Sequence, residues 1–90
     1  MFRVEWLPDA TNELTRIWLS ADSATRQTIT SASHEIDRRL ARNPNDEGES
    51  RPDDTRITFA APLAAKFTVD DVTRLVTVLD VSFYARRSRP

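Results

Sequence analysis

An aromatic and cationic cluster near the C-terminus carries the side chains best suited to chemistry or binding. It comprises Phe83, Tyr84, Arg86 and Arg87, and it follows an apolar run from Leu75 to Val81. The run places apolar side chains on both faces of an extended segment, which predicts a central strand buried on both sides. A rigid strand that ends in tyrosine and arginine side chains is a common way to build a binding site. We therefore expect this end of the chain to meet a partner.

Length and composition predict one small folded domain over residues 1–90, because 90 residues leave no room for a second core. The chain has no cysteine and one histidine, His34, without clustered carboxylates around it, so we expect no disulfide, metal or other cofactor. No apolar run reaches the roughly 18 residues of a membrane span, and the N-terminus lacks the apolar core of a signal peptide. The expectation is a cytoplasmic protein with no membrane contact and no small-molecule substrate.

The charge is unevenly distributed along the chain, although the net value is only −1. Residues 1–42 carry equal numbers of acidic and basic side chains. Residues 43–54 carry five acidic side chains against one arginine, and residues 55–90 carry six basic side chains against three acids. Local potential decides what a surface attracts, so the C-terminal half is expected to be the cationic half.

The N-terminal half is predicted to form a strand and a helical hairpin. Phe2 to Trp6 alternates apolar and charged residues, as a half-buried strand does. A second helix is predicted from about Ser23 to Arg42, capped by Asp22 and ended by Asn43-Pro44. A first helix, capped by Asp9, precedes it and has apolar residues at helical spacing: Ala10, Leu14, Ile17, Trp18 and Ala21. Trp6 and Trp18 are expected to anchor the sheet to this first helix.

The C-terminal half is predicted to form an antiparallel meander. Asn45 to Asp54 is polar and acidic and is expected to be an exposed, mobile loop. A strand over Thr55 to Ala60, with Ile57 and Phe59 as its apolar face, leads through Ala61-Pro62 to a strand over Leu63 to Val69. The turn at Asp70-Asp71 then leads to the long apolar strand. The predicted fold class is α+β, in the order β-α-α-β-β-β, with the helical hairpin packed on a small, mainly antiparallel sheet.

Short segments in this order resemble a known family over almost the whole chain. They are Phe2-Arg3-Val4-Glu5-Trp6-Leu7-Pro8-Asp9-Ala10, Leu14, Ile17, Ile36 to Leu40 ahead of Asn43-Pro44, Thr55-Arg56, Lys66 to Asp71, and Val78 to Val81 leading into Tyr84-Ala85-Arg86-Arg87. Their order and spacing are similar to those of the RelE/ParE bacterial toxins of type II toxin–antitoxin pairs. The resemblance implies a growth-inhibiting toxin that a cognate antitoxin protein neutralises.

The resemblance leaves three functions open. ParE-like toxins poison DNA gyrase, RelE-like toxins enter the ribosome and cut mRNA, and a toxin fold can also persist as a non-toxic interaction module. Cutting RNA without a metal requires a proton acceptor, a proton donor and cations that steady the phosphate. If the chain is such a metal-independent endoribonuclease, the resemblance implies Lys66, Tyr84 and Arg86 as its catalytic residues.

Three features favour the ParE-like function over the nuclease. Ala64 stands where nuclease members usually hold an arginine, and the loop before Thr55 is acidic where nucleases place lysines. The net charge of −1 is also low for a protein that grips RNA. In each alternative we expect the partner to lie as a helix or strand across the sheet and its basic edge. The predicted partner-binding residues are Arg56, Lys66, Arg74, Tyr84, Arg86 and Arg87.

Simpler structural roles are open for several of these side chains. Lys66 can be a solvated strand residue, and Arg56 can pair with Asp54 or Asp80 at the surface, a contact worth about 0–1 kcal/mol. Tyr84 can close the edge of the core with its hydroxyl in water. His34 is expected to be exposed and to have no role.

Overall fold

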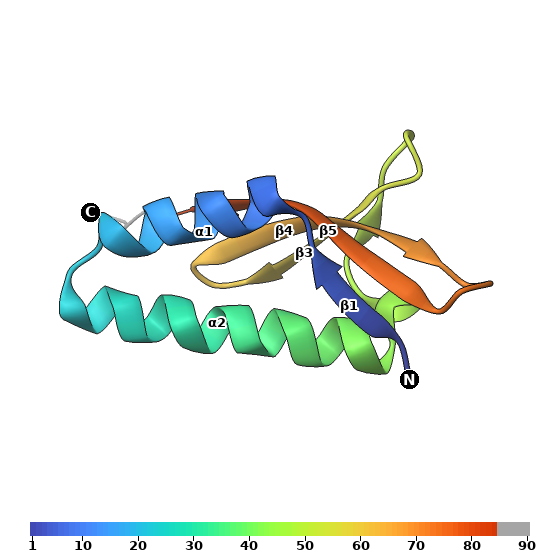
Figure 1. The fold of residues 1–90 in the computed structure, drawn as a ribbon, viewed down its shortest axis with the longest axis horizontal. Coiled ribbons are helices and arrows are strands. Elements are labelled where there is room, and N and C mark those ends of the chain that lie inside the picture. Colours follow the sequence, from blue (N-terminus) through green and yellow to red (C-terminus); the bar gives the residue numbers. More distant parts are fainter. Residues whose placement is uncertain (85–90) are drawn as a thin grey trace, which may run out of the picture.

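A helical hairpin lies against a twisted sheet in the computed structural model, which describes residues 1–84 (Figure 1). In chain order the elements are β1 (Arg3–Trp6), α1 (Pro8–Leu19), α2 (Ser23–Arg42), the 3-10 helix η1 (Pro44–Asp46), β2 (Glu49–Ser50), β3 (Arg56–Ala60), β4 (Leu63–Asp70) and β5 (Leu75–Phe83). The order matches the prediction except for η1 and the two-residue strand β2, which lie in or at the start of the segment expected to be a loop.

The five-stranded sheet has the order β1-β5-β4-β3-β2. β3, β4 and β5 form the predicted antiparallel meander, and β1 pairs in parallel with β5. Both helices contribute to a single buried cluster on one face of the sheet, through Ala10 of α1 and through Ile29, Ala32, Ile36 and Leu40 of α2. The predicted α+β class, the helical hairpin and the interior position of β5 are confirmed.

A β-bulge in β5 changes which of its side chains face the helices. Lys66 pairs with Asp80, whereas the next residue of β4 pairs with Val78, so Leu79 is an extra residue in β5. The bulge shifts the alternation by one residue, and Val76, Val78 and Val81 therefore all lie fully buried under the helices. Leu79 is only half-buried. The prediction that β5 is buried on both faces is wrong, because the bulge rather than two-sided burial explains its unbroken apolar run.

In strand β3 the side with Thr58 faces the helices, whereas the sequence predicted that the side with Ile57 and Phe59 would do so. Thr58 pairs with Ala65 on the helix face and is 3% exposed, whereas Phe59 pairs with Ala64 on the other face and is 47% exposed. The bulky Phe67 and the α2 side chains already fill the space above β3. A close-packed interior then leaves room only for small side chains there.

The N-termini of the two helices are capped differently. Asp22 caps α2 as predicted, since its carboxylate accepts a hydrogen bond of 2.8 Å from the backbone N–H of Thr25. The same bond lowers the pKa of Asp22 below 3.8. Asp9 does not cap α1: the helix begins at Pro8, with Leu7 at the cap position and no side-chain cap. Proline suits the first helical position because its φ is already helical and it has no N–H to satisfy.

The segment predicted as a mobile loop is held against β3 by specific contacts. Arg56 donates to the carbonyl oxygens of Glu47 at 3.0 Å and Gly48 at 3.3 Å, and to the Ser50 hydroxyl at 2.9 Å. Gly48 has a φ of +72°, and a Cβ there would lie 2.1 Å from the Ile57 carbonyl oxygen. The only glycine of the chain therefore sits where no side chain fits.

The hydrogen bonds of both tryptophans lead to α2, although the sequence analysis expected both side chains to join the sheet to α1. The indole N–H of Trp6 donates to Asp37 of α2 at 2.9 Å, so Trp6 ties β1 to the second helix. The indole N–H of Trp18 donates to Thr30 at 3.2 Å, and its ring stacks under the Arg26 guanidinium at 4.5 Å. Trp18 therefore joins the two helices on the outside of the hairpin.

Matched phenylalanine truncations test which side of β3 and β4 is the core. We expect Phe67→Ala to lower the free energy of unfolding by about 3–5 kcal/mol, because it leaves a cavity in a fully buried site. Phe59→Ala should cost only about 1–2 kcal/mol, since its ring is half exposed. Urea denaturation measures both values. Equal losses would contradict the assignment of the two faces.

Candidate functional site

The sheet face turned away from α1 and α2 holds most of the predicted functional side chains. Residues directly opposite each other on paired strands point to the same face, so the strand register defines this surface. We call it the open face, because the two helices pack on the other face and, of the described residues, only the β2–β3 turn reaches over it (Figure 1). Its side chains are Arg3, Glu5, Glu49, Ile57, Phe59, Ala64, Lys66, Thr68, Asp70, Leu75, Thr77, Asp80 and Ser82.

An exposed aromatic pair lies at one end of the open face. The rings of Phe59 and Tyr84 meet edge to face, with centroids 5.6 Å apart and planes at 88°. The backbone N–H of Tyr84 donates to the Pro62 carbonyl at 2.8 Å, which holds the tyrosine beside the turn between β3 and β4. Phe59 remains 47% and Tyr84 36% exposed, so the pair offers a fixed apolar surface to a partner.

Lys66 lies in the middle of the open face and is already paired. Its ammonium lies 3.7 Å from a carboxylate oxygen of Asp53, which belongs to the turn between β2 and β3. Asp80, directly across on β5, is a second carboxylate beside the lysine. The Thr55 hydroxyl donates to Asp53 at 2.6 Å. This bond, more than the charge of Lys66, lowers the pKa of Asp53 below 3.8.

The structure separates the other predicted partner-binding residues. Arg56 pairs with neither Asp54 nor Asp80; its side chain lies on the helix side of β3 and binds the Glu47–Ser50 segment. Arg74 lies in the β4–β5 turn with a φ of 59°, and its guanidinium stacks on Phe2 at 4.9 Å. The two predicted residues Arg86 and Arg87 lie outside the described residues.

Lys66 and Tyr84 share the open face but do not touch. Tyr84 follows Asp80 by four residues, and Asp80 is the cross-strand partner of Lys66. At about 3.3 Å per residue the two positions are about 13 Å apart along the sheet. Arg74 is ten residues from Tyr84, which places it about 30 Å away by the same measure. Of the predicted set, the structure thus brings Lys66 and Tyr84 to one surface.

The open face is acidic over the described residues. Its two basic side chains are each paired, Arg3 with Glu5 at 3.4 Å and Lys66 with Asp53 at 3.7 Å, and Arg51 of the β2–β3 turn contacts Glu49 at 3.8 Å. Against them stand five carboxylates on or over this face: Glu5, Glu49, Asp53, Asp70 and Asp80. A surface with this balance attracts cations more strongly than phosphates.

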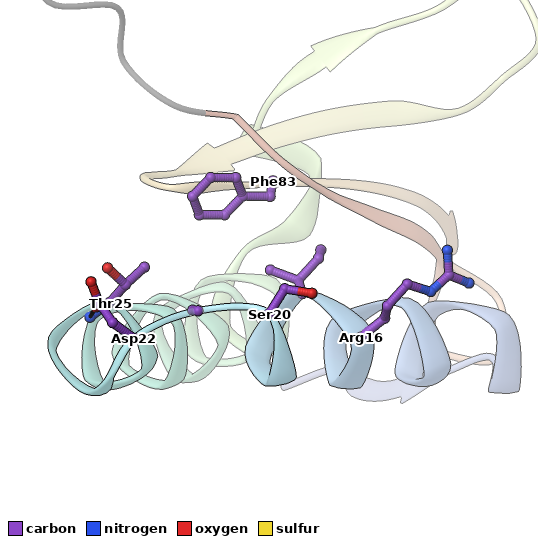
Figure 2. A pocket seen from close by; sticks show the side chains of 7 residues that line it. Arg16, Ser20, Asp22, Thr25 and Phe83 are labelled. Atoms are coloured by element: carbon purple, nitrogen blue, oxygen red, sulfur yellow. Dashed lines mark hydrogen bonds between the residues drawn. The ribbon is translucent and has the colours of Figure 1, made fainter.

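A cleft beside the aromatic end was not anticipated from the sequence. It has a volume of about 440 Å³ and lies between the end of β5 and the turn that joins α1 to α2. Figure 2 shows the Phe83 ring on one side and Arg16, Ser20, Asp22 and Thr25 on the other. Phe83 pairs with Leu63 on the helix side of the sheet. It is therefore separated from its neighbour Tyr84, although the sequence placed both in one cluster.

Residues 1–84 contain neither a cluster of metal-binding side chains nor a helix suited to crossing a membrane. Their histidine, aspartate and glutamate side chains form no group of three or more that could hold a metal ion. None of the helices in this part of the chain has the length and apolar character that crossing a membrane requires.

The pKa of Asp53 tests what holds the β2–β3 turn over Lys66. Because the folded pKa is lowered, the contact stabilises the fold above pH 3.8, and this stabilisation is lost as the pH falls through the folded pKa. We expect Thr55→Val to raise the pKa of Asp53 more than Lys66→Met does, as measured by NMR titration of the side-chain carboxyl. A larger effect of Lys66→Met would show that the ion pair, not the hydroxyl, anchors the turn.

Solved structures with a similar backbone include two toxin–antitoxin systems and one isolated toxin. The RelBE2 toxin–antitoxin complex of Mycobacterium tuberculosis contains a chain with a TM-score of 0.74 and 16% identity, covering 94% of this chain and 93% of that one. The chromosomal ParDE system of P. aeruginosa gives 0.71 and 16%, covering 94% and 98%. The isolated RelE toxin of E. coli gives 0.58 and 16%, covering 97% and 88%.

Comparisons of sequence alone add no relative, since no family model and no curated protein matches the chain. At 16% identity the structural likeness concerns the backbone arrangement, which extends over nearly all of each chain. It agrees with the resemblance to RelE/ParE toxins that the sequence indicated. The chain therefore has the fold of the RelE/ParE toxin superfamily.

Proposed function

We propose that this chain is the toxin of a type II toxin–antitoxin pair and that it acts by binding rather than by cutting RNA. Its target is then DNA gyrase, as for ParE-like toxins, and a cognate antitoxin neutralises it. The likeness to toxin chains of RelBE and ParDE systems supports the first part. The observation that carries the second part is the chemistry of the open face, an exposed aromatic pair with a surplus of carboxylates.

The described part of the open face is poorly suited to RNA cleavage. A phosphate in the transition state needs nearby cations and a proton donor and acceptor within hydrogen-bond reach. Lys66 is neutralised by Asp53 and flanked by Asp80, and Tyr84 stands about 13 Å away along the sheet. The carboxylates would repel the substrate phosphates at the position where the lysine would have to attract them.

The same surface is well suited to a protein partner. Tyrosine and phenylalanine rings that are fixed before binding supply much contact area at little entropic cost, and such residues often carry most of the binding energy. An antitoxin helix or strand laid across the sheet would cover Phe59 and Tyr84 and reach Lys66. Of the predicted partner-binding residues, Lys66 and Tyr84 are the described ones in position for this contact.

Induced expression in bacteria tests the proposed target. We expect growth to stop, with DNA-damage signalling and intact mRNA, and the purified chain to inhibit gyrase supercoiling. The replacements Lys66→Ala and Tyr84→Phe separate the alternatives. If ribosome-bound mRNA is cut and either replacement abolishes the cutting, the chain is a RelE-like nuclease. If growth continues with soluble protein present, the chain is a non-toxic interaction module.

Truncation of the aromatic pair tests the antitoxin surface. We expect Phe59→Ala and Tyr84→Ala each to weaken the complex with the antitoxin encoded beside this chain by about tenfold or more, which corresponds to roughly 1.4 kcal/mol. Calorimetric titration measures the loss. Leu19→Ala is the matched control, because Leu19 is an exposed apolar residue of α1 on the other side of the molecule. An equal loss of affinity with Leu19→Ala would contradict the proposal that the antitoxin binds the open face.

A further inference from the structure

The apolar part of the open face is concentrated at one end. Phe59 and Tyr84 form the exposed pair, and Ile57 and Ala64 lie beside them on β3 and β4. Ile57 and Ala64 are half-buried, so they form the floor of this surface rather than its contact points. A single apolar side chain from a partner can cover the two rings.

Two carboxylates lie in the cross-strand row next to this apolar end, one on β2 and one on β5, with the paired Lys66 between them. Glu49 is the cross-strand partner of Ile57 and lies diagonally from Phe59, a separation of about 7–8 Å. Asp80 lies on the same face as Tyr84, four residues earlier, or about 13 Å along β5. Asp80 forms no ion pair with another described residue, and Glu49 is 73% exposed with only a 3.8 Å contact to Arg51.

We infer that the open face binds a partner segment that carries lysine or arginine on both sides of an apolar anchor. The anchor covers Phe59 and Tyr84, and the cations meet Glu49 and Asp80. This inference rests on the proposed function, in which the open face meets a protein, and it adds the chemistry of that protein. It separates this surface from one that recognises phosphates or an acidic segment, either of which would need unpaired cations.

The spacing of the carboxylates fixes the spacing that the partner needs. In a helix, residues four apart lie about 6 Å along the axis, and residues eight apart about 12 Å. A helix with an apolar residue at position i can therefore place one cation toward Glu49 from a position four residues away. Glu49 and Asp80 lie in one cross-strand row with Ile57 and Lys66, and three strand spacings, about 14 Å, separate them. A helix that crosses the strands can therefore direct a second cation toward Asp80 from a position eight residues beyond the first. The segment is thus a short amphipathic helix of about three to four turns with basic flanks.

Two synthetic peptides and the full chain test the inference. Both peptides are helical and carry the same leucine and phenylalanine stripe, but lysines flank the stripe in one and glutamates in the other. We expect the lysine peptide to bind about tenfold more tightly at about 50 mM salt and the difference to shrink at about 500 mM, where the screening length is only a few ångströms. NMR shifts of Phe59 and Tyr84 identify the binding surface, and calorimetry gives the affinities.

Matched charge removals locate the effect. Asp80→Asn and Glu49→Gln should each weaken the lysine peptide by about two- to fivefold, the size of an exposed ion pair. Glu13→Gln removes the same charge from α1 and should leave the affinity unchanged, since Glu13 faces Arg16 on the helix side. Phe59→Ala should weaken both peptides alike, because it removes the apolar contact that they share.

Three results would overturn the inference. The first is equal or tighter binding of the glutamate peptide, and the second is no shift of Phe59 or Tyr84 with either peptide. The third is a rise of more than tenfold in affinity for the lysine peptide when Arg86, Arg87 and Arg89 are replaced by alanine, because the chain's own cations would then occupy the surface. Growth arrest and gyrase inhibition are scored separately, so the proposed function can fail while the peptide preference holds, or the reverse.

Discussion

The β-bulge at Leu79 is the constraint on which both the core and the open face depend. Before the bulge, Val76 and Val78 point to the helices, and without it the regular alternation would send Asp80 inward and Val81 outward. The extra residue reverses this order, so Val81 completes the buried face under the hairpin. The same shift brings Asp80 and Tyr84 to the outer surface. One inserted residue thus sets the composition of both sides of β5.

Packing above β3 has a similar two-sided consequence. The sheet and α2 enclose Phe67, Leu63, Ile36 and other large side chains that leave space only for Thr58 and Ala60 on the helix side. The larger Ile57 and Phe59 must then point outward, because the two faces of a strand alternate. Phe59 meets Tyr84 there, since the bulge has turned Tyr84 to the same face. The aromatic pair therefore depends on the core packing above β3 and on the bulge that shifts the register of β5.

The sequence predicted features with local causes and missed those set by pairing between distant segments. The bounds of α2, its cap at Asp22 and its stripe of Ile29, Ala32, Ile36 and Leu40 follow from helical spacing and capping chemistry, and they are confirmed. The bulge in β5 was missed because an apolar run without alternation also fits a strand buried on both faces. The face of β3 was missed because Thr58 is polar, although a hydroxyl that reaches Glu47 at 3.5 Å is tolerated beside the core.

The acidic segment before β3 changes the charge of the open face. Specific contacts with β3 hold this segment in place. Arg56 and the left-handed Gly48 bind it to the edge of β3, and the Thr55 hydroxyl turns Asp53 toward Lys66. The one lysine in the middle of the sheet is thereby paired with a carboxylate from outside the sheet. Because RelE and ParE toxins share this fold, the fold alone does not determine function, and the function of a chain with this fold depends on such side chains. In this chain they make the described part of the open face apolar and acidic.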